Sequence, residues 1–398
     1  MSRLRICQLV TELRPAGAER GVFELATRLD RRRFDVQVAA LRGGQVADWL
    51  ARAGLKVTVL GVRGKWDAVK LPALARFLRR QRVELLHTHL FHADLAGRLA
   101  AGPAGVGHLV HTVWTAEGRW RPWQFAFARL LAGRCERMIC LAESVRDFHA
   151  RKSGLPRAAY AVIPWGVDAA MYARDEEARR RLRTRWGVGR QTVLLAYVGR
   201  LESYKGIDAL LAAMERAVAG GAGGPWLELV VAGDGPRRQA VESFIARGEG
   251  GARTRLLGFV PNDWAAPAGG GGTAAGAESP LTVRAVLSAA DIFVMPSHWE
   301  GWGLALGEAM AAGLPAVGSD VPAVRELIAD GQTGLLVPPR DPGALAEALR
   351  RLAGDAELRR RMGAAARHRI AERFGLSSAI AAHEALYEQV ASRPGGGA

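Results

Sequence analysis

Cysteine is scarce in this chain of 398 residues: Cys7, Cys135 and Cys140 are the three present, and they show neither disulfide nor metal-ligand spacing. Long apolar runs are also missing, since none reaches the ~20 residues that a membrane-spanning helix requires. The opening residues form a short apolar pattern without the features of a signal peptide. We therefore expect a cytoplasmic protein in a reducing environment.

Acidic residues are in short supply in one part of the chain. Residues 1–170 hold 28 Lys and Arg against 14 Asp and Glu, whereas residues 171–398 hold 27 against 25. Nearly all of the net charge of +16 therefore lies in the first half. A basic surface attracts anionic partners such as phosphates, acidic glycans, acidic lipid surfaces or nucleic acid. A general bias toward Ala, Gly and Arg is an equally good explanation of the excess.

Short apolar runs alternate with helical stretches along the whole chain. The strands predicted in the first half are residues 4–10, 34–41, 55–60, 83–87, 108–112, 137–141 and 160–163, with helices such as 18–29, 68–80 and 122–132 between them. After a turn-rich segment, the predicted strands resume at 193–198, 226–232, 255–258, 292–295, 316–317 and 334–337. This alternation predicts an α/β fold with two Rossmann-like, doubly wound parallel-sheet domains facing a central cleft.

The predicted domains cover residues 1–167 and 168–375. Residues 376–398 contain an amphipathic helix, 377–390, that could pack back on the first domain, followed by a Gly-rich tail. Residues 262–280 include four consecutive glycines and show no periodicity. They are predicted to be a disordered surface insertion.

The clearest motif follows a predicted strand and reads Pro-Ser-His-Trp-Glu-Gly-Trp-Gly-Leu over residues 296–304. Gly301 and Gly303 allow backbone N–H groups to approach a ligand, and the helix predicted to begin near Gly303 favours an anion at its N-terminus. Glu300 and Glu308 can face one cleft roughly 10 Å apart, at ~1.5 Å per helical residue. That separation suits two ends of one elongated ligand rather than a metal pair. A solvated glutamate on an ordinary helix is the equally weighted alternative.

A second motif reads Gly-Arg-Leu-Glu-Ser-Tyr-Lys-Gly over residues 199–206. Arg200 at the strand end and Lys205 at the helix entrance could hold a diphosphate and stabilise it as it leaves. Two exposed basic residues in a loop are the alternative. The turn at 233–235 is predicted to be structural, because its single acidic residue, Asp234, does not suffice for a divalent ion.

Taken together, these motifs resemble glycosyltransferase family 4, the retaining transferases of glycosyltransferase group 1 with the GT-B architecture, over almost the whole chain. The resemblance implies an acceptor-binding first domain and a second domain that binds a nucleotide sugar. It implies transfer of a sugar, expected to be UDP-linked, to a glycan, a lipid-linked or another hydroxyl acceptor in cell-envelope or polysaccharide biosynthesis. It implies no metal and no other cofactor.

The resemblance also assigns roles to residues. Glu300 would contact the transferred sugar, and Glu308 would bind the ribose hydroxyls. Arg200 and Lys205 would bind the diphosphate, and His111 would reach the donor sugar. The further donor-binding residues that it implies are Gly17, Phe259, Val260, Gly301, Trp302, Gly303 and Leu304.

Some positions depart from the family pattern or are open to two interpretations. Trp165 stands where Asn is frequent in the family, and Trp302 stands where Phe is frequent, which leaves donor identity open. For His87, His89 and His92, packing and loop polarity explain the residue at least as well as a functional role. None of the three histidines is expected to bind a metal.

The resemblance implies a mechanism without a protein nucleophile. The leaving diphosphate can assist the acceptor hydroxyl on the same face of the sugar, while the protein supplies positioning and charge stabilisation. The basic first half favours an anionic or membrane-borne acceptor, at the inner face of a membrane. Residues 119–125 mix cations and aromatics as interfacial segments do, although an ordinary amphipathic helix packed on the sheet explains them as well.

Two other functions compete with this one. A nucleotide-sugar epimerase or hydrolase of the same architecture would consume the donor without an acceptor, and the spacing of the two glutamates disfavours it. A non-catalytic binding protein is the second alternative. No nucleic-acid partner is expected, because the basic half carries no recognition motif.

Overall fold

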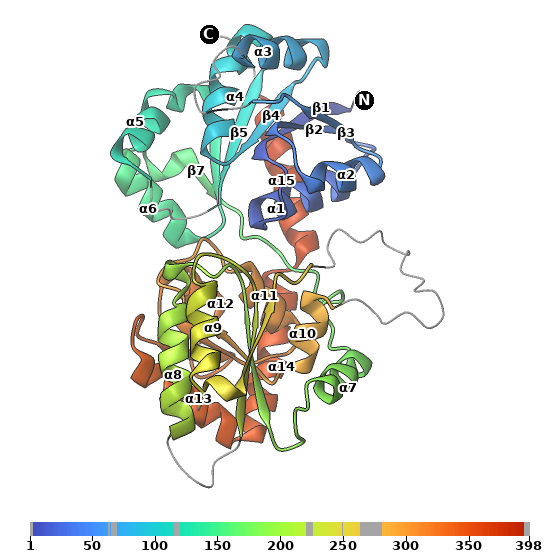
Figure 1. Cartoon of the computed structure of the whole chain (residues 1–398). Coiled ribbons are helices and arrows are strands. Elements are labelled where there is room, and N and C mark those ends of the chain that lie inside the picture. The colour runs from blue at the N-terminus through green and yellow to red at the C-terminus, as the bar shows by residue number, and fades with distance from the viewer. Residues whose placement is uncertain are drawn as a thin grey trace. The chain divides into compact units, whose positions relative to one another are not determined.

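The computed structural model describes residues 3–62, 64, 70–114, 120–219, 226–248, 250–262 and 281–393. They form two compact units, each with its own parallel sheet (Figure 1). Unit 1 holds the described residues up to Trp165 and from Ser377 onward, and unit 2 holds those from Gly166 to Leu376.

Unit 1 is built on a seven-stranded sheet with the order β3-β2-β1-β4-β5-β6-β7. All neighbouring strands are parallel. The strands are β1 (Leu4–Glu12), β2 (Phe34–Arg42), β3 (Lys56–Val59), β4 (Leu85–His89), β5 (His108–Val113), β6 (Arg137–Cys140) and β7 (Tyr160–Val162). The helices are α1 (Gly17–Arg28), α2 (Gln45–Arg52), α3 (Lys70–Arg80), α4 (Phe91–Ala104), α5 (Pro122–Leu130) and α6 (Glu143–Ser153), with short 3-10 turns at Ala132–Arg134 and Arg157–Ala159.

The last helix, α15 (Leu376–Ala391), packs within unit 1 although it ends the described chain. It lies beside the blue helix α1 and the sheet in Figure 1, where its red colour marks the distance in sequence. The Tyr387 hydroxyl lies 2.6 Å from Nδ1 of His87 on β4, and the Tyr387 ring meets Phe34 edge-on. The C-terminal helix is therefore part of the core of unit 1.

Unit 2 has a six-stranded parallel sheet with the order β10-β9-β8-β11-β12-β13. Its strands are β8 (Val193–Val198), β9 (Leu227–Ala232), β10 (Thr254–Gly258), β11 (Ile292–Met295), β12 (Ala316–Ser319) and β13 (Gly334–Val337). Its helices are α7 (Glu176–Arg185), α8 (Ile207–Ala219), α9 (Arg238–Ala246), α10 (Val283–Ala289), α11 (Leu304–Ala311), α12 (Pro322–Leu327), α13 (Pro342–Gly354) and α14 (Ala356–Arg373), with 3-10 turns at Ser203–Lys205 and Gly251–Arg253.

Helices on both faces explain why the central strands are buried along their length rather than alternating between buried and exposed residues. In β4, β5 and β11 every residue is buried. A parallel sheet covered on both sides has no solvent face, so its strands read as continuous buried runs. The predicted fold class, two doubly wound parallel-sheet domains, is confirmed.

Several predicted bounds differ from the observed ones. The strand predicted at 83–87 lies at Leu85–His89, because its pairing with β1 and β5 continues through His89. The predicted helix 122–132 ends at Leu130, where the chain turns into a 3-10 segment. Of the predicted insertion 262–280, only Asn262 belongs to the described chain. Residues 263–280 lie outside it, as does the tail from residue 394. Within the described ranges, no helix is both long and apolar enough to cross a membrane.

Candidate functional site

The order of the strands in unit 2 marks one place for a ligand. Strands β8 and β11 are neighbours, but the chain proceeds from β8 toward β9 and β10 and from β11 toward β12 and β13. In doubly wound sheets, ligands bind outside the carboxyl ends of the strands at this point of reversal. Arg200 and Lys205 follow β8, and Glu300 follows β11, so the two predicted motifs meet here.

Lys205 and Glu300 form an ion pair at this point. The Lys205 Nζ atom lies 2.6 Å from Oε1 of Glu300, and the Ser297 hydroxyl donates to the same oxygen at 2.7 Å. The side chains are 19% and 8% exposed, so the pair is largely shielded from water. A shielded charge pair interacts more strongly than one at the surface, and it presents a fixed cation and carboxylate to a ligand.

Gly206 allows the two loops to come this close. It has φ of +72°, and an added Cβ would lie 1.9 Å from the carbonyl oxygen of Pro296. Only glycine combines a left-handed backbone with such an approach at no steric cost. The same loops are joined by a hydrogen bond from the His298 N–H to the Tyr204 carbonyl and by stacked Tyr204 and Trp299 rings, 4.2 Å apart.

Glu308 lies in the second turn of α11 and is only 2% exposed. Its Oε1 atom accepts hydrogen bonds from the Tyr172 hydroxyl at 2.7 Å and from the Asn262 side-chain amide at 2.9 Å. The alternative of a solvated glutamate on a helix is therefore wrong. Two fixed donors hold the carboxylate in one orientation, which suits the recognition of sugar hydroxyls by a charged acceptor.

Arg200 differs from Lys205. Its side chain is 66% exposed and pairs with Glu202, while its carbonyl accepts a hydrogen bond from Tyr197. Within the described chain, no ion pair or hydrogen bond joins Arg200 to the Lys205–Glu300 pair. The surface-loop alternative thus describes Arg200 but not Lys205.

The glycine-rich loop between the two glutamates has the predicted course. Gly303, with φ of +93°, is the N-cap of α11, and Leu304 is the first helical residue. Trp302 is 3% exposed, and its ring packs against Gly307, where a Cβ would approach within 2.8 Å. Its side chain is therefore a packing element, which leaves the backbone of residues 301–304 as the part that can contact a ligand.

The predicted donor-binding residues Phe259 and Val260 directly follow β10. Phe259 is 66% exposed, whereas Val260 is buried. Asn262, two residues further on, reaches Glu308. The segment after β10 is therefore joined to the α11 carboxylate by a direct contact.

In unit 1, the corresponding reversal lies between β1 and β4, and α1 begins after β1. Gly17 is the first residue of that helix. Glu19, in the first turn, is 4% exposed, and burial raises the pKa of its carboxyl to about 7. A carboxyl group with this pKa is partly protonated at neutral pH, and no local pattern in the sequence indicates it.

His111, on β5, is fixed by the neighbouring strand. Its Nδ1 atom lies 3.0 Å from the Thr88 carbonyl oxygen, which can only accept, so Nδ1 carries the proton. Asp94 Oδ1 lies 3.5 Å from the same nitrogen and is held by Arg98. Burial lowers the pKa of His111 despite the nearby carboxylate. The imidazole is therefore neutral, with Nε2 as its hydrogen-bond acceptor.

The histidines of β4 belong to a buried network that ties α15 to the sheet. His87 contacts Tyr387 and the Thr112 hydroxyl, at 2.6 and 2.7 Å. His89 contacts the Gln8 side chain at 2.6 Å. Packing thus accounts for both residues, while His92 is exposed beside Phe91. Among the described residues, no group of three His, Cys, Asp or Glu side chains is placed to hold a metal ion.

Sequence reasoning missed Tyr172, Asn262 and Ser297 as partners of the two glutamates. Tyr172 and Asn262 lie 136 and 46 positions from Glu308. No local pattern signals such pairs. Ser297 lies within the motif at residues 296–304. Its position three residues before Glu300 was the one local signal for this contact.

Comparison with known proteins bears on both units. Residues 15–171 match the family model "Glycosyltransferase Family 4", and residues 192–355 match "Glycosyl transferases group 1". The chain is 28% identical to 2-deoxystreptamine N-acetyl-D-glucosaminyltransferase of Streptomyces fradiae, over 100% of this chain and 92% of that protein. It is 25% identical to the UDP-Gal:alpha-D-GlcNAc-diphosphoundecaprenol alpha-1,3-galactosyltransferase of Escherichia coli, over 89% of each.

Solved structures share the fold. The structure of Anabaena HepE in complex with UDP and glucose superposes with a TM-score of 0.82, at 19% identity, over 97% of this chain and 100% of that one. The two family models between them span most of the chain, and the HepE structure shares its fold. The chain therefore belongs to glycosyltransferase family 4 and is a retaining, hexosyltransferase-type enzyme of the GT-B fold that uses a nucleotide sugar.

Proposed function

We propose that this enzyme transfers a hexosyl group from a UDP-sugar to a hydroxyl of a lipid-linked or glycan acceptor in cell-envelope or polysaccharide biosynthesis. The observation that carries the proposal is the shielded Lys205–Glu300 pair at the point of strand reversal in unit 2, next to the helix that holds Glu308. UDP is the nucleotide bound in HepE and named for the E. coli relative, which supports the choice of donor.

In this proposal, Glu308 accepts hydrogen bonds from the ribose hydroxyls, and Glu300 does the same for the transferred sugar. Lys205 donates to the diphosphate, with Arg200 as a second cation from the same loop. A buried carboxylate that already accepts from Tyr172 and Asn262 is preorganised, so donor binding orders little further. The backbone of residues 301–304, at the N-terminus of α11, adds N–H donors for the anion.

The chemical step follows from these roles. The bond between the anomeric carbon and the diphosphate oxygen breaks, and the acceptor oxygen bonds to that carbon from the same face. The acceptor proton passes to the departing diphosphate, so atoms and charge balance without a protein nucleophile. Lys205 stabilises the charge that develops on the leaving group. His111, neutral with Nε2 as acceptor, receives a hydrogen bond from a hydroxyl of the sugar. No metal or other cofactor takes part in this proposal.

The acceptor must be argued from this chain, because the relatives' names give different acceptors. The first 170 residues carry 28 Lys and Arg against 14 Asp and Glu. Such a surface favours an anionic acceptor, or an acceptor presented at an anionic membrane face, by long-range attraction. We accordingly place the enzyme in the cytoplasm, in peripheral contact with the inner face of the membrane.

The first test is the ligand-induced shift of the melting temperature against UDP-, GDP- and ADP-sugars. A ligand that binds only the folded state raises the melting temperature. We expect a shift with UDP-sugars that Glu308→Ala abolishes. A shift with GDP- or ADP-sugars alone would refute the choice of donor. In a separate assay of donor turnover, release of free sugar at a rate that added acceptors do not change would favour a hydrolase.

A further inference from the structure

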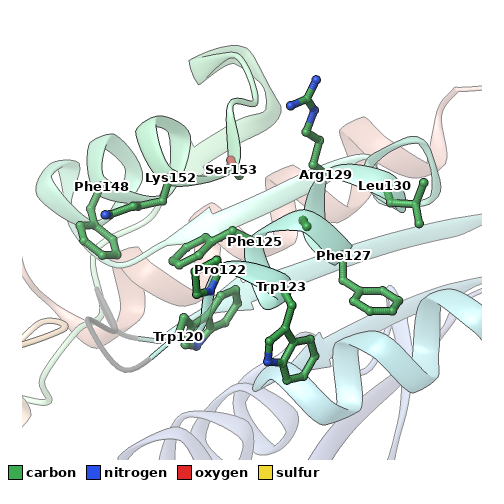
Figure 2. A pocket seen from close by; sticks show the side chains of 11 residues that line it. Trp120, Pro122, Trp123, Phe125, Phe127, Arg129, Leu130, Phe148, Lys152 and Ser153 are labelled. Carbon is green, nitrogen blue, oxygen red and sulfur yellow. The ribbon is translucent and has the colours of Figure 1, made fainter.

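A groove of about 870 Å³ lies in unit 1 on the helical pair α5 and α6. Figure 2 shows the side chains that line it, with α5 contributing most of them. They are Trp120, Pro122, Trp123, Phe125, Ala126, Phe127, Arg129, Leu130, Phe148, Lys152 and Ser153. Aromatic and aliphatic groups predominate, and two cations complete the lining.

The apolar side of the groove is unusually exposed. Trp123, Phe127 and Leu130 are 47%, 40% and 77% exposed, and all three belong to α5. Single exposed apolar residues are ordinary, but a contiguous group on one helix beside a groove marks a binding surface. Phe125 and Phe148 form its inner part, with ring centroids 6.1 Å apart across the two helices.

The cations of the groove are not neutralised by neighbouring acids. Residues 120–157 contain eight Lys and Arg against three Asp and Glu. Each acid already has a partner: Glu136 pairs with His108, while Glu143 and Asp147 pair with Arg146.

Arg129 and Lys152 lie one on each helix, and neither forms an ion pair with a described residue. A groove with aromatic walls and two available cations complements a molecule that is apolar in one part and anionic in another. An inorganic anion would leave the aromatic wall without a partner, and a neutral apolar ligand would leave the cations without one.

We propose that the α5–α6 groove binds the hydrocarbon chain of an anionic amphiphile, whose phosphate is attracted by the positive charges of Arg129 and Lys152. This inference rests on the proposed function in one respect: the amphiphile is the lipid carrier of the acceptor. The binding itself requires only the groove, so it is measurable on the protein without any turnover.

Dodecyl phosphate below its micellar concentration is the probe, titrated calorimetrically into the full-length protein. We expect saturable binding of one molecule per chain, no detectable binding of inorganic phosphate, and binding of the neutral dodecyl maltoside at least ~10-fold weaker. The double variant Trp123→Asp, Phe127→Asp should weaken dodecyl phosphate by more than ~10-fold. Arg129→Ala combined with Lys152→Ala should bring dodecyl phosphate to the affinity of the maltoside.

Two matched controls separate the groove from general effects. Trp226→Asp changes a tryptophan of unit 2 that is 61% exposed, and Arg151→Ala removes an exposed cation of α6 outside the groove. Both should bind the probe as the unchanged protein does. Equal binding by the groove variants would overturn the proposal, as would binding to anionic vesicles with none to the monomeric amphiphile, which would indicate a bilayer surface instead.

Failure of the proposed function would be recognised separately. The melting-temperature shift with UDP-sugars depends on unit 2 and should be the same in the groove variants and in the unchanged protein. Loss of that shift in the unchanged protein, with probe binding intact, refutes the donor assignment and leaves the amphiphile site. Loss of probe binding, with the nucleotide shift intact, refutes the amphiphile site alone.

Discussion

The ammonium nitrogen of Lys205 lies 2.6 Å from Oε1 of Glu300, although 95 positions separate the two residues in the chain. The contact joins the loop after β8 to the loop after β11, and both side chains are largely shielded. A diphosphate bound by Lys205 must share it with Glu300. Glu300 therefore holds the Lys205 ammonium group in position before the donor binds. Less ordering of this side chain is then needed during catalysis.

Removing the cation tests this relationship. Lys205→Ala should reduce kcat about 10²- to 10³-fold, because a fixed cation no longer stabilises the leaving diphosphate. Steady-state transfer with a UDP-sugar is the measurement. Arg200→Ala, in a side chain that is 66% exposed, is the matched comparison and should have a smaller effect. Turnover of Lys205→Ala within a few-fold of the unchanged enzyme would remove Lys205 from the mechanism.

Glu308 should determine donor affinity rather than folding. Glu308→Gln keeps the shape and an acceptor for Tyr172 and Asn262 but removes the charge, so UDP affinity should fall by roughly 1–3 kcal/mol, or about 5- to 150-fold. Titration calorimetry with UDP measures this. Glu357→Gln, on the exposed first turn of α14, is the control and should leave the affinity unchanged. Unaltered UDP affinity in Glu308→Gln would contradict the ribose role.

Gly206 should be intolerant of any side chain. Gly206→Ala places a Cβ 1.9 Å from the Pro296 carbonyl oxygen at a φ of +72°, so the loops must separate. Gly187→Ala is a close control, because Gly187 has φ of +67° with no atom within 4 Å of the added Cβ. The control should lose about 1–2 kcal/mol of stability from the backbone alone. Gly206→Ala should lose clearly more in urea unfolding, together with nucleotide binding; equal losses in both variants would show that the close approach is unimportant.

The buried histidines of unit 1 make stability depend on pH on the acid side. Burial lowers the pKa of His383 to about 4 and that of His87 well below its ordinary value. Between pH 6.5 and 4 these histidines bind protons in the unfolded chain but not in the folded chain. Stability is therefore lost as the pH falls through this range. Each such histidine changes the free energy of unfolding by up to ~1.4 kcal/mol per pH unit.

Urea unfolding from pH 7.5 to 4.5 measures that slope. His383→Gln should reduce it by up to one proton's worth. His368→Gln is the comparison variant, since the His368 side chain is 71% exposed and pairs with Glu372 at the surface, and it should change the slope less than His383→Gln does. A slope that is the same in both variants would mean that His383 accepts a proton in the folded state.

Glu19 should have the opposite dependence. Its folded pKa of about 7 lies above the ordinary value of 4.5, so the folded chain retains a proton that the unfolded chain releases. The free energy of unfolding therefore falls as the pH rises from 4.5 to 7, because Glu19 loses its proton in the unfolded chain but keeps it in the folded chain. Glu19→Gln removes this cost and should stabilise the protein by up to about 3 kcal/mol at pH 8 but not at pH 4.5. Equal changes in unfolding free energy at the two pH values would exclude a raised pKa.

The order of elements was accessible from the amino-acid pattern alone. Strands such as Val193–Val198 and Gly334–Val337 are continuous apolar runs between turns, because both faces of a parallel sheet are covered by helices. The glycine-rich loop before Leu304 was equally recognisable, since a left-handed N-cap and a helix start are local features. These are properties that a few neighbouring residues decide by themselves.

The tertiary structure decided which residues that are distant in the sequence form ion pairs and hydrogen bonds with one another. Lys205 meets Glu300, Tyr172 and Asn262 meet Glu308, and Tyr387 meets His87, all across strands or helices that a local pattern does not connect. The local sequence sets which side chains of a strand or helix share a face. Only folding brings side chains that are distant in the sequence together and removes the water between them. Because burial and proximity set the pKa of Glu19 and the charge environment of Lys205, the chemistry of the site depends on the sheet topology rather than on the motifs themselves.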